Sequence, residues 1–393
     1  MSSELERRLQ RVLEMVEPGE PATEQAKASA LSAAAGSGLR SRYRLALVAA
    51  AVVGALAVTG VTLAASRTAR EVIGIADPTN QSHQRPPANY GPLPPGSGGF
   101  AAYGGGRLWL ASPSLNITDR PYSAAELSPG AINIAVGSGH RLDVVRLSDG
   151  SIAWSHATAG RVVAAAWAPI GTEIAYVVES HGGAQLRMIE GDGDHDRLID
   201  GSVSAVTPSW RADSLALAYA GADGQVVVRD LAAGRSTVVR SRGCGLVRTA
   251  QVAFAPRGTL LAASVGDGNL LVTDPARGWV ACAAPVSLIG PLPAPQLAWI
   301  SGRELVASVD QFVARMGLRG RSVVPIALAE ATAGISGLTV SPDRRQIAVG
   351  LWRDNRLQLV VAEMPRPGDT TLRVVRILRE LPNSSAAHTL IWR

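Results

Sequence analysis

The sequence contains very little cysteine and almost no lysine, and each shortage argues against a class of protein. It has two cysteines, Cys244 and Cys282. Two cysteines cannot form a disulfide-rich scaffold, and their spacing does not match that of a zinc site. Lys27 is the single lysine, so 37 of the 38 basic residues are arginines, and these are scattered rather than gathered into one stripe. This scatter argues against nucleic acid as a partner, although the net charge is +6.

Charged residues are also scarce, at 18% of the chain, whereas hydrophobic residues make up 47%. This balance excludes a mainly disordered protein and allows a large core. The 41 glycines and 24 prolines suit a fold with many turns.

A phrase of about ten residues recurs in the last two-thirds of the chain and organises it. Each copy has a large apolar residue, a turn that usually contains proline or glycine, and a short strand centred on Ile-Ala or Leu-Ala; the copies begin at Leu127, Trp167, Trp210, Phe254, Trp299 and Val340. Their separations of 40, 43, 44, 45 and 41 residues are typical of propeller blades. Alternating apolar and polar residues between Gly/Asp turns follow each copy and predict a second strand pair. Each period therefore predicts one four-stranded blade.

The two ends of the repeat region decide the number of blades. Residues 100–103 and 107–110 resemble the second and third strands of a blade that lacks its first strand, and residues 388–392 resemble a first strand with nothing after it. Joining them completes a further blade and closes the ring, which removes two exposed sheet edges. We therefore expect an all-β, seven-bladed β-propeller over 99–393. The alternative is a six-bladed ring with 100–121 as an extra edge.

Residues 1–44 predict a helical segment on the cytoplasmic side of a membrane. Ser3 and Glu6 form a capping box, and apolar residues follow at helical spacing on one face. Seven positive and six negative charges leave the segment nearly neutral. It is interpreted either as a short lead-in helix or as a docking helix for a partner.

Residues 45–65 predict a transmembrane helix that contacts the lipid bilayer. The segment has no charged residue and is about 31 Å long as a helix. Three arginines precede it and two follow closely, which places the N-terminus in the cytoplasm and the propeller outside the membrane. Cleavage after Ala65 is the alternative. The Pro/Gly-rich stretch 66–98 predicts an extended linker.

The repeated Trp/Phe-x-Pro-x-Gly-x-x-Ile/Leu-Ala phrase resembles the TolB-like and WD-repeat-like propellers of bacteria. The layout of helix, single span and propeller resembles single-pass membrane proteins of high-GC actinobacteria that have no assigned activity. The resemblance covers the chain from about Leu45 onward. It implies a propeller that serves as a protein-binding platform, and it implies little about chemistry.

The stretch Gly191–Asp196 alternates carboxylates in the way that a calcium loop begins. Asp192, Asp194 and Asp196 are weak candidates for metal ligands. Val203 occupies the position where an EF-hand has its bidentate glutamate, so that type of site is excluded. A solvated hairpin turn is the favoured interpretation, and no metal or cofactor is predicted.

The phrase also supplies a set of repeated aromatic residues: Trp167, Trp210, Phe254, Trp299 and Trp392. Their fixed place before a turn favours packing between blades over an aromatic binding face. The two cysteines fall within one predicted blade, and outside the membrane a bridge between Cys244 and Cys282 would close about 39 residues. Bridged and free thiols are both left open.

No motif predicts a catalytic residue. The six histidines are dispersed, and neither a His-x-x-x-His pair nor a Gly-x-Ser-x-Gly elbow occurs. We therefore expect a non-catalytic, membrane-anchored scaffold for an unidentified protein partner, bound through the variable loops between the phrase copies. Two alternatives remain: a signalling protein that acts through 1–44, and a hydrolase or lyase with its site in the central channel.

Overall fold

The structure of the chain is a computed structural model. It describes residues 99–104, 107–110, 122–240, 248–265, 269–283, 296–353, 356–382 and 389–393. The propeller belongs to a compact unit, Pro86–Arg393. None of the helices formed by these residues is long and apolar enough to cross a bilayer. The predicted segments 1–44, 45–65 and 66–98 lie outside the described residues.

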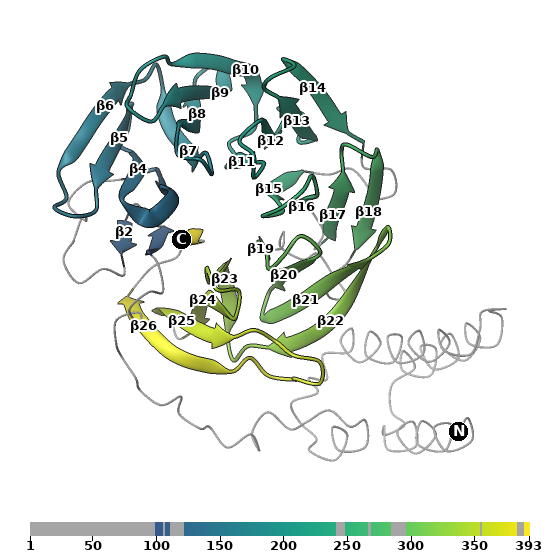
Figure 1. The fold of residues 1–393 in the computed structure, drawn as a ribbon. Helices are drawn as coiled ribbons and strands as arrows, with labels where there is room; N and C mark the ends of the chain where they lie inside the picture. Colours follow the sequence, from purple (N-terminus) through teal and green to yellow (C-terminus); the bar gives the residue numbers. More distant parts are fainter. Residues whose placement is uncertain are drawn as a thin grey trace, which may run out of the picture. The chain divides into compact units, whose positions relative to one another are not determined.

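Seven antiparallel sheets form a ring, and we call the centre of this ring the channel (Figure 1). We number as blades 1 to 6 the six four-stranded sheets in chain order, and as blade 7 the sheet that contains both ends of the described chain. In each of blades 1 to 6 the first strand lies nearest the channel and the fourth lies at the rim. The prediction of an all-β, seven-bladed propeller is confirmed.

Blades 1 to 3 come first in the chain. Blade 1 consists of β3 (Ala124–Leu127), β4 (Asn133–Gly137), β5 (Arg141–Arg146) and β6 (Ile152–Ala157), with the 3-10 turn η2 (Pro129–Ala131) after β3. Blade 2 consists of β7 (Arg161–Trp167), β8 (Glu173–Ser180), β9 (Gly183–Glu190) and β10 (Arg197–Val203). Blade 3 consists of β11 (Ser209–Trp210), β12 (Ala216–Ala220), β13 (Val226–Asp230) and β14 (Arg235–Val239).

Blades 4 to 6 follow in the chain. Blade 4 consists of β15 (Thr249–Phe254), β16 (Leu261–Val265), β17 (Asn269–Asp274) and β18 (Trp279–Ala283). Blade 5 consists of β19 (Gln296–Trp299), β20 (Glu304–Val309), β21 (Phe312–Arg319) and β22 (Ser322–Glu330). Blade 6 consists of β23 (Gly334–Val340), β24 (Gln346–Arg353), β25 (Arg356–Glu363) and β26 (Val374–Pro382).

The second strand of a blade is its most buried part. All five residues of β12 and all five of β16 are buried, because neighbouring sheets cover both of their faces. A strand covered on both faces reads as a continuous apolar run instead of an alternation. The small residues of these strands, such as Ala218 and Ala263, leave room for neighbouring sheets to approach each other near the channel.

Blade 7 joins the two ends of the propeller. Its innermost strand, β27 (Thr389–Trp392), pairs with β1 (Phe100–Gly104), which pairs with β2 (Arg107–Leu110). Phe100 lies opposite Trp392, and their rings pack edge to face with centroids 5.9 Å apart. The composite blade predicted from the two ends is therefore confirmed. The six-bladed alternative is wrong, because residues 100–104 pair with 389–392 instead of forming an extra edge.

Hydrogen bonds extend this closure to blade 1. The backbone N–H of Arg393 donates to the carbonyl of Gly99 at 2.8 Å, and the guanidinium of Arg393 pairs with Glu126 in β3. Both termini of the propeller are therefore tied to each other and to the neighbouring blade.

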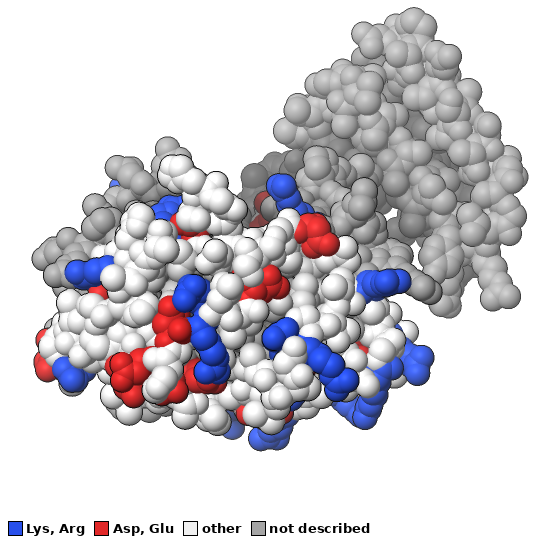
Figure 2. Space-filling view, turned by 90° about the horizontal axis from the view of Figure 1, so that it is seen from above, with Lys and Arg blue, Asp and Glu red and all other residues white. Residues whose placement is uncertain are grey.

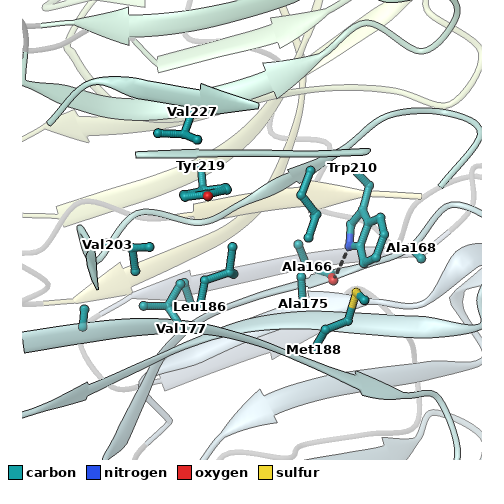
Figure 3. Packing of buried hydrophobic residues seen from close by; sticks show 13 residues of the cluster. Ala166, Ala168, Ala175, Val177, Leu186, Met188, Val203, Trp210, Tyr219 and Val227 are labelled. Carbon is teal, nitrogen blue, oxygen red and sulfur yellow. Dashed lines mark hydrogen bonds between the residues drawn. The ribbon is translucent and has the colours of Figure 1, made fainter. Parts of the chain in front are cut away.

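The core lies between sheets, where side chains from neighbouring blades interdigitate. Figure 3 shows the cluster between blades 2 and 3, in which Met188 and Ala166 pack against Trp210. The indole N–H of Trp210 donates to the carbonyl of Ala166 at 2.9 Å. Trp210 is thus both buried between the two blades and hydrogen-bonded across them. The bond fixes the position of its ring relative to blade 2.

Candidate functional site

A cavity of about 230 Å³ opens where the first strands of blades 4 to 7 end. The phrase itself lines it: the aromatic rings of Phe254, Trp299 and Trp392, and the turn residues Pro256 and Pro342. Small residues of the first strands, including Ala253, Ala298 and Thr339, complete the wall. The cavity wall therefore contains three aromatic residues and two prolines at one end of the channel.

The alternation of β15 and β19 explains this lining. In β15 the buried Val252 and Phe254 alternate with the half-buried Gln251 and Ala253, and β19 alternates in the same way. One face of β15 therefore packs against blade 3 through Val252 and Phe254, and the other lies against blade 5 with Gln251 and Ala253. The half-buried residues of this second face are small or uncharged.

Gln251 joins two blades beside the cavity. Its side-chain amide donates to the carbonyl of Leu297 at 2.9 Å and accepts from the N–H of the same residue at 2.9 Å. The amide thus makes two hydrogen bonds to the backbone of β19, which belongs to a different sheet from β15. This bond fixes the cavity wall where two sheets meet.

Arg344 is the charged residue of the lining. It has a φ of 65°, and its Nη1 donates to the carbonyls of Trp299 at 3.1 Å and Ile300 at 2.9 Å. Partial burial lowers the pKa of Arg344, and the positive charge of Arg257 lowers it further. An arginine stays protonated at neutral pH even so, and the cavity therefore has a cation at its edge.

Ser341 is the hydroxyl of the lining that comes closest to a catalytic pattern. Its Oγ donates to Asp343 at 2.6 Å and accepts from the backbone N–H of Gln346 at 2.9 Å. The described lining residues include no histidine, cysteine or carboxylate. A serine paired with a carboxylate but lacking an imidazole has no base in the arrangement that activates a serine nucleophile.

The acidic stretch Gly191–Asp196 lies in the hairpin between β9 and β10. The carboxylate of Asp192 accepts from the backbone N–H of Asp194 at 3.1 Å, which is an Asx turn. Asp196 is engaged elsewhere: it accepts from the hydroxyl of Tyr176 at 2.7 Å and from Nη2 of Arg187 at 2.6 Å. Across the described part of the chain, no group of three His, Cys, Asp or Glu residues is placed to hold a metal ion.

Asp196, Tyr176 and Arg187 form a polar cluster that the sequence did not predict, because its members are separated along the chain. His156 of blade 1 joins it, with Nε2 3.4 Å from Asp196 Oδ2. Burial alone would raise the pKa of Asp196, but the hydrogen bonds from Arg187 and Tyr176 and the nearby positive charges hold it below its usual value. Burial, followed by the bond to Asp196, raises the pKa of Tyr176. The cluster connects the outer parts of blades 1 and 2.

The five repeated aromatic residues are all buried, with at most 8% of each exposed. Trp299 repeats the bond made by Trp210: its indole N–H donates to the carbonyl of Ala253, in the preceding blade, at 2.8 Å. Trp167 instead donates within its own turn, to Gly171 at 3.2 Å. Phe254, Trp299 and Trp392 therefore have two positions in the fold at once: they are buried in the packing, and they line the cavity.

Cys282 lies in β18 and is disulfide-bonded. The chain has two cysteines, and Cys244 lies outside the described residues. The pairing of Cys244 with Cys282 therefore stays a prediction.

With the ring and its cavity established, similarity to solved structures identifies the fold. The chain has a WD40-type β-propeller fold. The Cps50 (Swd1) β-propeller domain of Myceliophteria thermophila is similar with a TM-score of 0.51 and 12% identity, over 67% of this chain and 86% of that one. The RRP9 WD40 repeats (0.50, 14%, over 65% and 80%) and U3-55K (0.50, 15%, over 66% and 81%) are similar as well.

These identities show the fold alone. No family model matches the chain. No curated protein matches it in sequence. The functional argument therefore depends on the residues of the site.

Sequence reasoning missed the cavity because it treated the phrase as purely structural and expected binding in the variable loops. The phrase did contain a signal: turns that carry proline and arginine after a large apolar residue recur in blades 4 and 6, at Pro256 and Pro342. That the first strands of four neighbouring blades end around one opening depends on the closed ring, which sequence spacing alone does not describe.

Proposed function

We propose that the propeller is a protein-interaction module, and that the chain is a single-pass membrane protein with 1–44 in the cytoplasm, 45–65 in the bilayer and the propeller outside. The observation that carries the first part is the cavity at the channel mouth, whose wall combines aromatic rings, prolines and one arginine. Aromatic and arginine side chains are the types that contribute most to protein interfaces. The WD40-type fold supports this assignment at the level of architecture.

The ring suits this role because it is rigid. Blades 1 to 6 each have four hydrogen-bonded strands, and side-chain bonds such as Gln251 to Leu297 join neighbouring sheets. A rigid surface loses little conformational entropy when a partner binds, which favours affinity. The partner is expected to be a protein. Neither nucleic acid nor a cofactor is part of this proposal.

Crosslinking in native membranes tests the module. A photo-reactive amino acid at Thr339, in the cavity wall, is expected to crosslink a discrete protein partner. The same amino acid at Leu198, which is 52% exposed in the outer strand β10, serves as the control and should not yield that product. Identical products from both positions, or none from Thr339, would contradict the proposal.

Membrane anchoring is tested separately by carbonate extraction. The wild-type chain should stay in the membrane pellet, whereas Val52→Arg/Leu56→Arg should release it, because each arginine near the centre of a span opposes insertion by about 2.5–3.5 kcal/mol. Ala88→Arg/Leu93→Arg, in the predicted linker, is the matched control and should stay in the pellet. Release of the wild-type chain would refute the anchor and leave the module untouched.

A second proposal, a regulatory role for 1–44, comes from its predicted amphipathic helix. The segment would transmit binding at the propeller to a cytoplasmic protein. A pull-down with 1–44 is expected to recover one partner that is lost on Leu9→Glu, in the apolar stripe, and kept on Arg8→Glu. Equal recovery with both variants would refute this role.

A further inference from the structure

The turns that follow the first strands of the blades all lie on one face of the ring, which we call the phrase-turn face. In blades 1 to 3 these turns expose aliphatic side chains: Ile132 is 69% exposed, Ile170 63% and Leu215 50%. Three of the seven large hydrophobic side chains that are exposed in the described chain therefore lie in these turns. We call these three residues the apolar arc.

The three turns contact each other, so the apolar arc is continuous. The backbone N–H of Ile170 bonds to Ser214 Oγ at 3.3 Å, which joins the turns of blades 2 and 3. A β-carbon added at Gly171 would lie 3.9 Å from Pro129 Cγ, so the turns of blades 1 and 2 also touch.

The charged side chains within or directly after the turns of the apolar arc form ion pairs. Arg211 Nε lies 2.9 Å from Asp213, and Glu173 lies 2.8 Å from Arg197. The apolar arc therefore has no excess charge of either sign in its turns.

The turns of blades 4 to 6 are different and carry exposed arginines: Arg257, Arg303, Arg344 and Arg345. We call these four residues the basic arc. None of the four forms an ion pair with any residue that the structure describes. An exposed surface with several uncompensated positive charges attracts acidic partners.

The basic arc is also continuous. A β-carbon at Gly302 would lie 3.5 Å from the carbonyl oxygen of Arg257, so the turns of blades 4 and 5 touch. The guanidinium of Arg344 bonds to the carbonyls of Trp299 and Ile300, so the turn of blade 6 lies against that of blade 5.

Two carboxylates lie within these turns and are already engaged. Glu304 pairs with Arg315 at 2.7 Å. Asp343 accepts from the Ser341 hydroxyl and from the backbone N–H of Arg345, and these two bonds lower its pKa. The four arginines therefore outnumber Asp343, whose pKa the positive charge of Arg345 also lowers, and the arc keeps a positive excess.

We propose that the phrase-turn face binds an amphipathic, acidic segment of a partner protein, with aliphatic side chains on the apolar arc and carboxylates on the basic arc. This inference rests on the interaction module proposed above and specifies its ligand. The cavity of about 230 Å³ lies among the turns of the basic arc and can admit one side chain of the segment. Arginine forms bidentate bonds with carboxylates, which suits this pairing.

The electrostatics also orient the segment. Asp192 and Asp194 lie in the hairpin next to the turn of blade 2, because the N–H of Gly191 bonds to the carbonyl of Thr172 at 2.9 Å. These carboxylates repel acidic residues from the apolar side. The rim seen in Figure 2 carries both acidic and basic side chains, so it offers no comparable field of one sign.

The separation of the two arcs favours a peptide over an anionic membrane. A membrane-binding surface places cationic residues around its inserted aliphatic side chains. Here the aliphatic residues occupy blades 1 to 3 and the cations blades 4 to 6. A segment with one apolar and one acidic side fits that division.

The test uses the full chain in detergent and a fluorescein-labelled peptide of roughly 14 residues that places leucine at helical spacing among glutamates. Fluorescence anisotropy is expected to show saturable binding. Arg257→Glu/Arg303→Glu should weaken it at least about tenfold, and Leu215→Ser by about fivefold. A peptide with lysine in place of glutamate should not bind.

Matched variants provide the controls. Arg240→Glu/Arg248→Glu changes the charge equally at exposed residues on the opposite face, where fourth strands end and first strands begin. Leu198→Ser removes an aliphatic side chain of similar exposure from the rim. Both should leave affinity within about twofold. Equal weakening by the two charge variants, at unchanged melting temperature, would overturn the proposal.

Two further arms separate the possible failures. A random peptide library panned on the full chain should enrich acidic, leucine-containing sequences. Enriched peptides that lose binding only on Arg240→Glu/Arg248→Glu would refute this inference and keep the interaction module, whereas no enrichment would refute both. Displacement of the labelled peptide by vesicles of phosphatidylcholine and phosphatidylserine in a ratio of about 7:3 would show that the face binds lipid and overturn the proposal.

Discussion

At the scale of the residue, single side chains join blades by directional bonds. Trp210 and Trp299 each donate to a carbonyl of the preceding blade. Asp196 accepts from two strands of its own blade and faces a histidine of the preceding blade. These bonds fix how neighbouring sheets are oriented, because apolar packing alone has no preferred direction.

Trp210→Phe tests the indole bond. The change keeps most of the buried ring but leaves the carbonyl of Ala166, itself 7% exposed, without its donor. We expect the free energy of unfolding in urea to fall by about 1–3 kcal/mol. Trp167→Phe is the control, because its acceptor, Gly171, lies in a half-exposed turn that water can reach. Equal losses in the two variants would show that the bond contributes nothing beyond packing.

Asp196→Asn tests the half-buried carboxylate through pH. The pKa of Asp196 in the folded chain lies below its ordinary value of 3.8. Its contribution to stability is therefore complete above about pH 4 and is lost as pH falls through the lower, folded pKa. Stability of the wild type should decline more steeply than that of Asp196→Asn between about pH 5 and pH 2.

Asp213→Asn is the exposed comparison for that experiment. The pKa of Asp213 is also lowered, since hydrogen bonds from Arg211 and from the N–H of Leu215 outweigh its partial burial. Its ion pair is largely solvated, and its variant should follow the wild-type profile closely. Parallel profiles for wild type and Asp196→Asn would refute a structural role for the cluster around Asp196.

At the scale of the element, the connections between blades depend on glycine where backbone segments approach closely. Gly160, between β6 and β7, is buried, and a β-carbon there would overlap the carbonyl oxygen of Glu179. Gly182, in the turn between β8 and β9, has open space around it. The same residue type is thus required at one connection and replaceable at the other.

Gly160→Ala is therefore expected to lower the free energy of unfolding by about 1–3 kcal/mol, because β7 or β8 must shift to admit the methyl group. Gly182→Ala should change it by less than about 0.5 kcal/mol. The two variants alter the unfolded chain in the same way, so their difference measures the clash alone. Chemical denaturation of both variants decides the question, and equal values would mean that the connection adjusts freely.

At the scale of the whole molecule, the ring followed from the sequence because its signals are local and repeated. The phrase marks each first turn and second strand, and the unmatched ends at 100–110 and 388–392 indicated a shared blade. The cavity and the arrangement of charge did not follow, since they depend on which turns become neighbours. Tyr176, Arg187 and Asp196 show the same limit: each looks ordinary in the sequence, and only the folded blade brings them together.

Because the ring is closed through blade 7, we predict that it opens first at this blade. β27 and β1 come from the two ends of the propeller, so neither is held by a covalent connection to the other. Amide hydrogens of these strands should exchange at a lower free energy than those of β12, which lies within a continuous blade. Trp392→Ala, which removes a buried ring packed on Phe100, should widen that difference and destabilise blade 7 by about 3–5 kcal/mol.

Trp279→Ala provides the comparison for this last prediction. Trp279 is 9% exposed in β18, within the continuous blade 4, so its loss should speed exchange in β17 and β18 and leave β27 and β1 protected. Hydrogen exchange followed by mass spectrometry resolves these strands in a single experiment. If Trp392→Ala instead accelerated β12 and β27 equally, the ring would open only by global unfolding, and the shared blade would not be its weakest joint.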